Sequence, residues 1–438
     1  MKEFAFDFRD LIPANIEKKG QAILSSLLRP IKLLLEQRKI PEKGWSDDVI
    51  EMFLKLLSWM DTDKDPKAAR IGEREARIAS PLISKQSYGF NHGIGRSGEI
   101  DASQPKAPGS SLMYKLTNRL ALQALKKFGA PNIKNAIVLP LSTGMSIGLS
   151  FAAIRKKVSQ KIVLCTRIDH TSPLKGLELV GLTPQIVDST LHGDAVRVDP
   201  DEILRKIDDN TIGILSTTTF FPPRESDEVK EIAKIAEERD VYHVINNAYG
   251  VQSREIMKKI QGAMDAGRVD AIIQSTDKNF LTPVGGAIIA APSELFIEEV
   301  SKCYAGRATA APVIQFLSAI LSLGMQGYEK LRDHQETNRL LLENLLKELA
   351  ESCNERLLAV KNPIGCAMTL NQQNPKKVGG ILYELRVTGP RAYEKGDKLG
   401  ACHDNYPQSY LCLNAAIGSR ESDVRNAVQR LEKALKQA

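Results

Sequence analysis

The sequence predicts an α/β protein whose central element is a mainly parallel β-sheet covered by helices. Short apolar runs alternate with helical patterns from about residue 135 to residue 291, and polar side chains follow several of these runs. The length of 438 residues leaves room for further units on both sides of this region. We expect a helical N-terminal extension over residues 1–130, a large catalytic domain over 131–324 and a smaller α+β domain over 325–438.

The N-terminal extension begins with a helical pattern over about residues 16–39. Its expected apolar face consists of Ile23, Leu27, Ile31, Leu34 and Leu35. The same stretch is basic through Arg29, Lys32, Arg38 and Lys39. This surface suits RNA or a second subunit, although a solvated amphipathic face is the commoner origin of such a pattern. Pro41 ends the helix, and residues 47–60 predict another.

Three short segments rich in Gly, Ser, Pro and cations follow this helix pair. They are GEREAR at 72–77, HGIGRSG at 92–98 and QPKAPGSS at 104–111. The last two resemble loops whose backbone amides and arginines bind an anion. They contain no GxxxxGK[ST] loop, and no clear strand precedes them, so neither a Walker loop nor a dinucleotide fingerprint is indicated.

The central region predicts a succession of βαβ units. The expected strands are residues 136–139, 162–165, 185–187, 212–216 and 242–245, and the expected helices are 145–155, 173–180, 200–207 and 227–239. Ligands of such sheets bind at the carboxyl ends of the strands.

Residues with suitable chemistry stand at these ends. Thr143 and Gly144 open a helix whose amides suit a phosphate, and His170 has a ring that can stack on an aromatic group. Asn246 follows the strand 242–245. Taken singly, each has an ordinary structural explanation: a helix cap, a hydrogen-bonded histidine or a turn residue.

Lys278 lies between the apolar runs 269–273 and 287–291, with a glycine pair at 285–286. We interpret the segment as a strand, a tight turn that carries the lysine, and a second strand. An amine held there can form a Schiff base with a carbonyl cofactor such as pyridoxal phosphate. The alternative is an ordinary surface lysine.

This order of residues resembles the fold-type I pyridoxal-phosphate enzymes. Their pattern is a phosphate-binding helix start, a ring-stacking residue, an acid in a D-x-A-[HY]-G segment and then the Schiff-base lysine. The present chain departs from it at Asn246, which stands where the acid partners the pyridine nitrogen. Because a neutral amide stabilises a pyridinium less than a carboxylate does, the ring should withdraw electrons more weakly.

Within this class the chain resembles the selenium transferases that convert O-phosphoseryl-tRNA to selenocysteinyl-tRNA in archaea and eukaryotes. The likeness extends over about residues 38–423 and rests on GERE at 72–75, HGIGRSG at 92–98, NNAYGVQS at 246–253, DKNF at 277–280 and YAGRA at 304–308. By position it implies substrate-phosphate ligands at Arg74, Arg96, Ser97, Gln104 and Arg307. It also implies cofactor contacts at Thr143, Gly144 and Asn246, the Schiff base at Lys278, and a tRNA contact at Arg391.

The resemblance implies pyridoxal phosphate as cofactor, and tRNA(Sec) charged with O-phosphoserine and selenophosphate as substrates. Lys278 would remove the α-proton, phosphate would leave from Cβ, and selenium would add to Cβ. Arginines suit this substrate because their planar guanidinium binds phosphate bidentately. The family also implies a homotetramer, to which the basic helix with Arg29, Arg38 and Lys39 would add a tRNA surface or a subunit contact.

Composition places few further limits on the chain. It has 42% hydrophobic and 26% charged residues and a net charge of +7, which permits an anionic partner. Six cysteines without CxxC spacing predict neither a zinc site nor a disulfide framework. Residues 1–7 lack the apolar core of a signal peptide, and no run reaches the ~18 apolar residues of a membrane helix. We expect a cytoplasmic protein without a membrane segment.

The C-terminal third predicts long helices over residues 314–352, apolar runs at 367–370, 381–387 and 409–413, and a final helix from Glu421. Two other functions stay open. A cysteine desulfurase or amino-acid lyase would need a reactive cysteine near the cofactor. A non-catalytic tRNA-binding protein of the same fold would not need Lys278.

Overall fold

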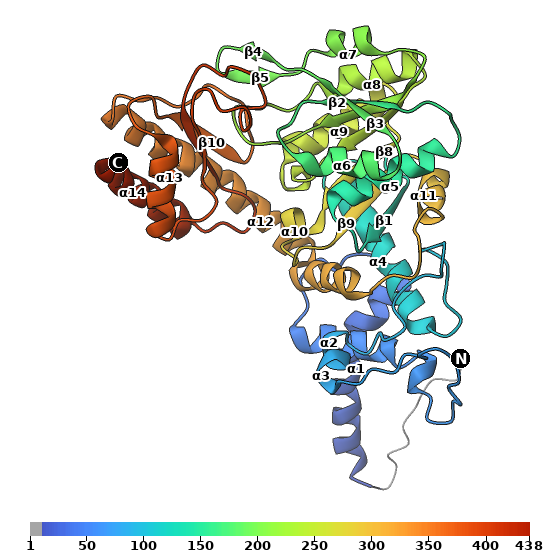
Figure 1. Cartoon of the computed structure of the whole chain (residues 1–438). Coiled ribbons are helices and arrows are strands. Elements are labelled where there is room, and N and C mark those ends of the chain that lie inside the picture. The colour runs from blue at the N-terminus through green and yellow to red at the C-terminus, as the bar shows by residue number, and fades with distance from the viewer. Residues whose placement is uncertain (1–10) are drawn as a thin grey trace.

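The computed structural model describes residues 11–438, so residues 1–10, with the segment used above to judge a signal peptide, lie outside it. Figure 1 shows three regions: helices α1–α4 at one end, a central sheet flanked by helices, and a small domain beside the sheet. No helix within 11–438 combines the length and apolar character that crossing a membrane requires.

The N-terminal region is helical, as expected. Its elements are α1 (Ala14–Gln37), α2 (Asp47–Ser58), the 3-10 turn η1 (Thr62–Lys64), α3 (Pro81–Gln86) and α4 (Pro108–Lys127). The expected apolar face of the first helix is only half correct. Ile31 and Leu34 are buried, whereas Ile23, Leu27 and Leu35 are exposed. Ile23 and Leu27 are exposed because no other described element covers the N-terminal part of α1. The segment QPKAPGSS is not a loop throughout, since α4 begins at Pro108.

The central sheet has seven strands in the order β1-β9-β8-β7-β6-β2-β3. Their bounds are Asn135–Leu139, Ala287–Ala291, Ala271–Ser275, Tyr242–Asn246, Thr211–Thr217, Ile162–Thr166 and Thr183–Val187. Only β9 is antiparallel to its neighbours, which confirms the mainly parallel sheet. Strands β6, β8 and β9 are buried along their whole length. Cover on both faces explains why they appear in the sequence as continuous apolar runs.

Helices connect these strands. They are α5 (Thr143–Arg155), α6 (Thr171–Leu179), α7 (Pro200–Lys206), α8 (Val229–Glu238), α9 (Arg254–Ala266), α10 (Thr276–Phe280) and α11 (Glu294–Ser301), with a 3-10 turn η2 (Gly250–Gln252) and a small hairpin of β4 (Thr190–His192) and β5 (Ala195–Arg197). The sequence interpretation omitted α9, although Ile256, Met257, Ile260 and Ala263 are buried at helical spacing.

Helix α12 (Ala311–Ser352) joins the large domain to the small one. It bends at Gly324, whose φ of 61° lies in the left-handed region. A Cβ there would lie 2.6 Å from the backbone nitrogen of Gly44, so the segment before α2 can cross the helix only at a glycine. Met325 N donates to Pro41 O at this crossing. The kink coincides with the expected boundary at residue 324, and the division into domains remains a proposal.

The small domain has its own core. A three-stranded antiparallel sheet of β10 (Gly365–Thr369), β12 (Tyr410–Asn414) and β11 (Arg391–Tyr393) packs with α13 (Pro375–Glu384) and α14 (Glu421–Gln437). Two of the three expected apolar runs form strands. The run 381–387 instead completes α13 and its C-cap, where Val378 and Leu382 are buried one turn apart.

Candidate active site

A cavity of about 130 Å³ lies at the carboxyl ends of the parallel strands. It is lined by segments that follow β1, β2, β6, β7 and β8, namely residues 142–144, 168–173, 219–220, 246–249 and Lys278. All five residues predicted to contact the cofactor therefore share one site. They do so because parallel strands end at the same edge of the sheet.

Lys278 does not lie on a tight turn as expected, but in the middle of the short helix α10. This helix is fixed on two sides: Asn279 Nδ2 donates to Ala248 O at 2.8 Å, and Tyr328 Oη donates to Asn279 O at 2.9 Å. Lys278 Nζ lies 3.2 Å from Asp277 Oδ2 and 3.4 Å from Ser275 Oγ. The amine is therefore held at the cavity by two polar neighbours that the sequence interpretation did not select.

The start of α5 offers a place for a phosphate. Ser142 caps the helix by accepting from Met145 N, and Thr143 Oγ1 is buried without a hydrogen-bond partner. A Cβ at Gly144 would lie 2.1 Å from Ser172 Oγ, so glycine is needed for α5 to approach α6. Thr219 Oγ1, which lines the same cavity, is also buried without a hydrogen-bond partner among the described residues. Two unpaired buried hydroxyls in one cavity fit a polar ligand such as pyridoxal phosphate.

His170 and Asn246 complete the cavity wall. His170 Nδ1 accepts from Ser172 N at 3.2 Å, and partial burial, with the nearby cations of Arg391 and Lys278, lowers its pKa. The ring is therefore neutral at pH 7, which suits stacking on an electron-poor aromatic group. Asn246 is buried, and its side chain bonds to Ala248 N and Thr217 Oγ1. Asn246 therefore places a neutral amide at the position where the fold-type I pattern has an acid.

The residues predicted to bind the substrate phosphate form a second group that does not line the cavity. The loop carrying Arg96 and Ser97 pairs with the segment carrying Arg307, because Ile94 and Ala308 exchange two backbone hydrogen bonds. Arg74 Nη2 donates to Asn91 O at 3.0 Å, just before this loop. Arg74, Arg96, Ser97 and Arg307 are exposed and Gln104 is half-buried. We call these five residues the clamp.

The residues predicted to contact tRNA lie in two places. Arg29, Arg38 and Lys39 are exposed on α1 and just after its end. Arg391, at the start of β11, stacks on Phe221 with its guanidinium carbon 3.4 Å from the ring centroid. Phe221 in turn packs against Tyr249 of the cavity wall. Arg391 is thus closer to the cavity than its sequence position suggests.

The sequence interpretation missed three residues that line the cavity, Thr219, Phe220 and Tyr249, and it missed Asp277, which contacts Lys278 Nζ. Thr219 and Phe220 follow β6 directly, so the strand-end rule that selected Asn246 would also have selected them. Tyr249 belongs to the motif NNAYGVQS and Asp277 to the motif DKNF, but neither motif by itself indicates a role for them.

Comparison with known proteins identifies the relatives of this chain. The family model described as O-phosphoseryl-tRNA(Sec) selenium transferase matches residues 60–436. The protein of that name from Methanopyrus kandleri is 46% identical over 431 residues, covering 98% of this chain and 99% of its own length. The crystal structure of an archaeal O-phosphoseryl-tRNA(Sec) selenium transferase superposes with a TM-score of 0.95 at 44% identity, covering 98% and 99% of the two chains. A bacterial sphingosine-1-phosphate lyase, at 15% identity, a TM-score of 0.59 and coverage of 99% and 93%, shares the fold alone.

Proposed function

This chain belongs to the O-phosphoseryl-tRNA(Sec) selenium transferase family, and we propose that it catalyses the reaction for which the family is named. The substrates are tRNA(Sec) charged with O-phosphoserine and selenophosphate, and the cofactor is pyridoxal phosphate. The observation that carries the proposal is Lys278 Nζ at a cavity whose other walls include Thr143, His170 and Asn246. Conversion of phosphoseryl-tRNA(Sec) to selenocysteinyl-tRNA(Sec) by the purified protein, dependent on selenophosphate, is the direct test.

Different residues of the cavity bind different parts of the cofactor. Lys278 holds it covalently, Thr143 and Gly144 hold its phosphate at the start of α5, and His170 and Asn246 contact its ring. Bound pyridoxal phosphate supplies an electron-withdrawing ring that stabilises negative charge at the substrate α-carbon. Since Asn246 adds no charge to this ring, the site favours a substrate whose leaving group departs easily, and phosphate is such a group.

Lys278 is the residue we assign to proton transfer. Once its amine is free, it takes the proton from the substrate α-carbon as a general base. Asp277 and Ser275, at 3.2 and 3.4 Å from Nζ, keep the amine directed along the cavity during that step. Both act on the lysine and not on the substrate.

The clamp is assigned to the substrate phosphate. A phosphoseryl group carries about −1.5 to −2 charges near neutrality, so arginine pairs are its natural ligands. Because none of the five clamp residues lines the cavity of the same chain, we propose that subunits associate and that one subunit's clamp serves another's cavity. A homotetramer of the kind the family resemblance implies provides such pairs, and the mass of the native assembly tests it.

Replacing Arg96 with alanine is expected to reduce kcat/KM for phosphoseryl-tRNA by about ten- to a hundred-fold or somewhat more. The physical reason is the loss of a charge-assisted hydrogen bond worth roughly 1.5–3 kcal/mol. The melting temperature should hardly change, since Arg96 is exposed. Arg119→Ala, which removes a cation on α4 away from the clamp, is the control. Unchanged kcat/KM for Arg96→Ala would remove this loop from the clamp.

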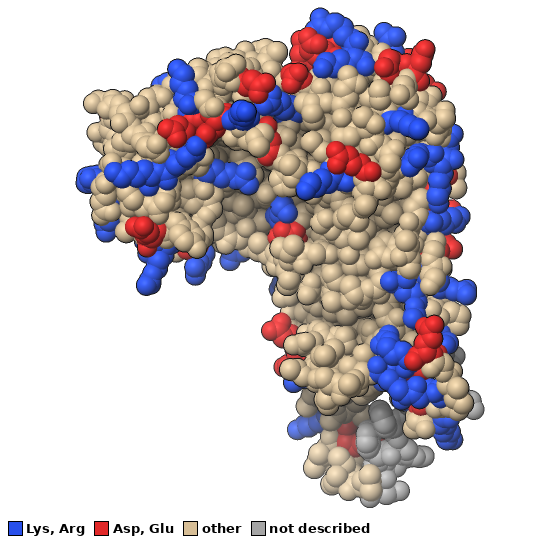
Figure 2. All heavy atoms as spheres, in the orientation of Figure 1, with Lys and Arg blue, Asp and Glu red and all other residues tan. Residues whose placement is uncertain are grey.

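We propose that tRNA contacts Arg391 and the basic part of α1. The aminoacyl end of the tRNA must enter the cavity, and Arg391 stacks on Phe221 beside that cavity. In Figure 2, Lys and Arg side chains form a row across the small domain and gather on the N-terminal region, which suits a polyanion. A protein that consumes a charged tRNA is expected in the cytoplasm.

Neutralising Arg29, Arg38 and Lys39 together should weaken tRNA binding and flatten its dependence on salt. Each lost phosphate contact lowers the slope of log Kd against log salt by about 0.7–0.9. Binding is measured at several salt concentrations with the triple alanine variant and with a control variant lacking three exposed cations at α8 and α9 of the large domain, Lys230, Arg239 and Lys258. If the α1 substitutions leave the salt dependence of tRNA binding unchanged, the surface with Arg29, Arg38 and Lys39 serves a subunit contact or folding instead.

The cysteines argue against the desulfurase or lyase alternative. None of the six lines the cavity, and Cys165, Cys366, Cys402 and Cys412 are buried. Burial raises the pKa of Cys366 and of Cys402 to about 12, the opposite of the activation that a nucleophilic thiolate needs. The alternative of a non-catalytic tRNA-binding protein does not explain why Lys278 lies at the cavity.

A further inference from the structure

A buried histidine and a buried aspartate face each other next to the clamp segment without forming a hydrogen bond. His92 Nε2 lies 3.8 Å from Asp63 Oδ1, and each side chain is only 3% exposed. Both atoms are buried, and neither has a hydrogen-bond partner among residues 11–438. Such atoms are costly to bury and are rarely left unpaired in folded proteins. A closure of less than 1 Å would bring this pair to hydrogen-bond distance.

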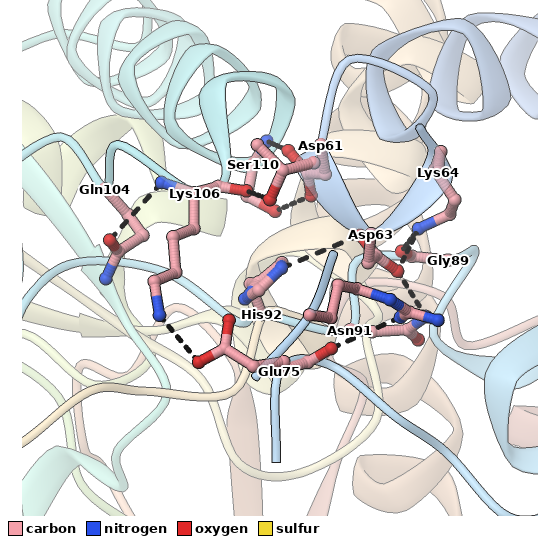
Figure 3. Close-up of polar contacts among 12 residues, drawn as sticks. Asp61, Asp63, Lys64, Glu75, Gly89, Asn91, His92, Gln104, Lys106 and Ser110 are labelled. Carbon is pink, nitrogen blue, oxygen red and sulfur yellow. Dashed lines mark hydrogen bonds and ion pairs between the residues drawn. The ribbon is translucent and has the colours of Figure 1, made fainter. Parts of the chain in front are cut away.

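Asp63 is already anchored through its other oxygen. Asp63 Oδ2 accepts from Lys64 Nζ at 2.7 Å and from Asn91 Nδ2 at 3.0 Å, and Lys64 Nζ also donates to Gly89 O. Figure 3 shows this group around His92, with Glu75 and Lys106 on the other side of the ring. The carboxylate is therefore fixed, and His92 is the partner that is free to approach it.

His92 is directly joined to the clamp. Asn91, whose carbonyl accepts from Arg74, precedes it, and the loop with Arg96 and Ser97 follows it. Ile94, two residues on, is bonded to Ala308 beside Arg307. A movement of His92 toward Asp63 is thus transmitted to all three arginines of the clamp through short covalent and hydrogen-bonded connections.

The charged groups around the ring are mixed. Asp61, Asp63 and Lys64 face it from the segment at η1, and Glu75, paired with Lys106 at 2.6 Å, faces it from the segment after α2. Burial outweighs the three carboxylates and lowers the pKa of His92 below its ordinary value. In the free protein the ring is therefore neutral at pH 7.

We propose that His92 and Asp63 form a proton-dependent latch that positions the clamp for a dianionic phosphate monoester. This inference rests on the proposed function, because it presumes that the clamp binds the substrate phosphate. When a dianion draws the clamp residues together, the connected loop carries His92 toward Asp63, and the ring takes up a proton as it closes onto the carboxylate in a charge-assisted pair. His92 is a positioning residue, since it acts through the clamp loop and does not touch the substrate.

The latch has a definite sign of pH dependence. Protonation of His92 and binding of a dianion favour each other, and this coupling is reciprocal. The pKa of His92 is higher in the dianion-bound state than in the free state. The contribution of His92 to dianion binding is therefore present at low pH and is lost as pH rises through the pKa of the bound state. Dianion affinity should fall by up to about tenfold per pH unit in this range, and binding near pH 6.5 should be accompanied by proton uptake of at most one per site.

Calorimetric titration of the holoenzyme with sulfate tests the latch. Sulfate is a dianion that does not itself titrate near neutrality, and the phosphate site of the cofactor is already filled in the holoenzyme. Titrations in two buffers of different ionisation enthalpy give the number of protons taken up. We expect uptake in the wild-type protein and none in His92→Asn or Asp63→Asn, with His334→Asn, an exposed histidine on α12, behaving as the wild type.

Steady-state kinetics supply a second readout. In His92→Asn the KM for phosphoseryl-tRNA should lose the rise with pH that loss of the His92 proton causes, while the opposite change caused by ionisation of the substrate phosphate near pH 6 remains and kcat keeps its own profile. If sulfate fails to compete with phosphoseryl-tRNA, the clamp assignment itself is wrong. If sulfate competes but the wild type takes up no proton, or if uptake persists in both variants, the clamp stands and the latch is overturned. The wild-type titration decides this even where a variant does not fold.

Discussion

Replacement of Lys278 with alanine should abolish turnover while leaving the fold intact. The substitution removes both the covalent attachment point and the proposed general base, and proton transfer alone contributes about 10²–10⁴-fold to the rate. The side chain is about one-third exposed, and its two hydrogen-bonding neighbours, Asp277 and Ser275, bond to each other without it. We therefore expect a rate below detection together with a melting temperature close to that of the wild type.

Two measurements accompany the rate. Borohydride reduction followed by mass spectrometry should attach the cofactor to the peptide containing Lys278 in the wild type and to no peptide in the variant. Lys258→Ala, on the exposed side of α9, is the matched control and should keep both activity and attachment. Turnover at the wild-type rate in Lys278→Ala would refute the assignment of this lysine as the attachment point and the general base.

Replacement of Asp227 with alanine should have the largest effect on stability. Asp227 and Arg224 form an ion pair in which the side chains are 0% and 1% exposed. Asp227 Oδ2 also accepts from Thr217 N at 2.7 Å, which fixes the end of β6 where Thr219 and Phe220 enter the cavity. Removing one partner leaves a buried arginine without a counter-charge, which costs about 3–5 kcal/mol in the free energy of unfolding.

Urea unfolding of the variant, followed by a probe in the large domain, measures this cost. The urea concentration at the midpoint of unfolding should fall, while the slope of the unfolding free energy against urea concentration stays unchanged. Glu202→Ala breaks a pair between Glu202 and Arg205 on α7 that is exposed to solvent, and should cost less than about 1 kcal/mol. An effect of Asp227→Ala no larger than that of Glu202→Ala would show that this buried pair contributes little to the stability of the large domain.

The sequence by itself determined the class of fold and part of the lining of the cavity. Strands such as β6 and β8 are local apolar runs, and the residues that follow β1, β2, β7 and β8 are adjacent in the chain to the strand that positions them. Because parallel strands end at one edge, strand order along the chain was enough to place Thr143, His170, Asn246 and Lys278 together. The half-exposed face of α1 and the helix α10 were misjudged, since local patterns do not say what covers a helix.

Only the tertiary structure decided which charged groups are buried and which residues distant in sequence meet. Asp63 and His92 are 29 positions apart, and neither has a local signal of burial, yet their buried atoms Oδ1 and Nε2 face each other in one interior site. The separation of the clamp from the cavity of the same chain, and the placement of Arg391 against Phe221, follow likewise from the packing of whole domains. Secondary structure depends on contacts between residues close in the chain, so its periodicity can be read from the sequence. The arrangements above depend on contacts between residues far apart in the chain, which form only when the helices and strands pack together.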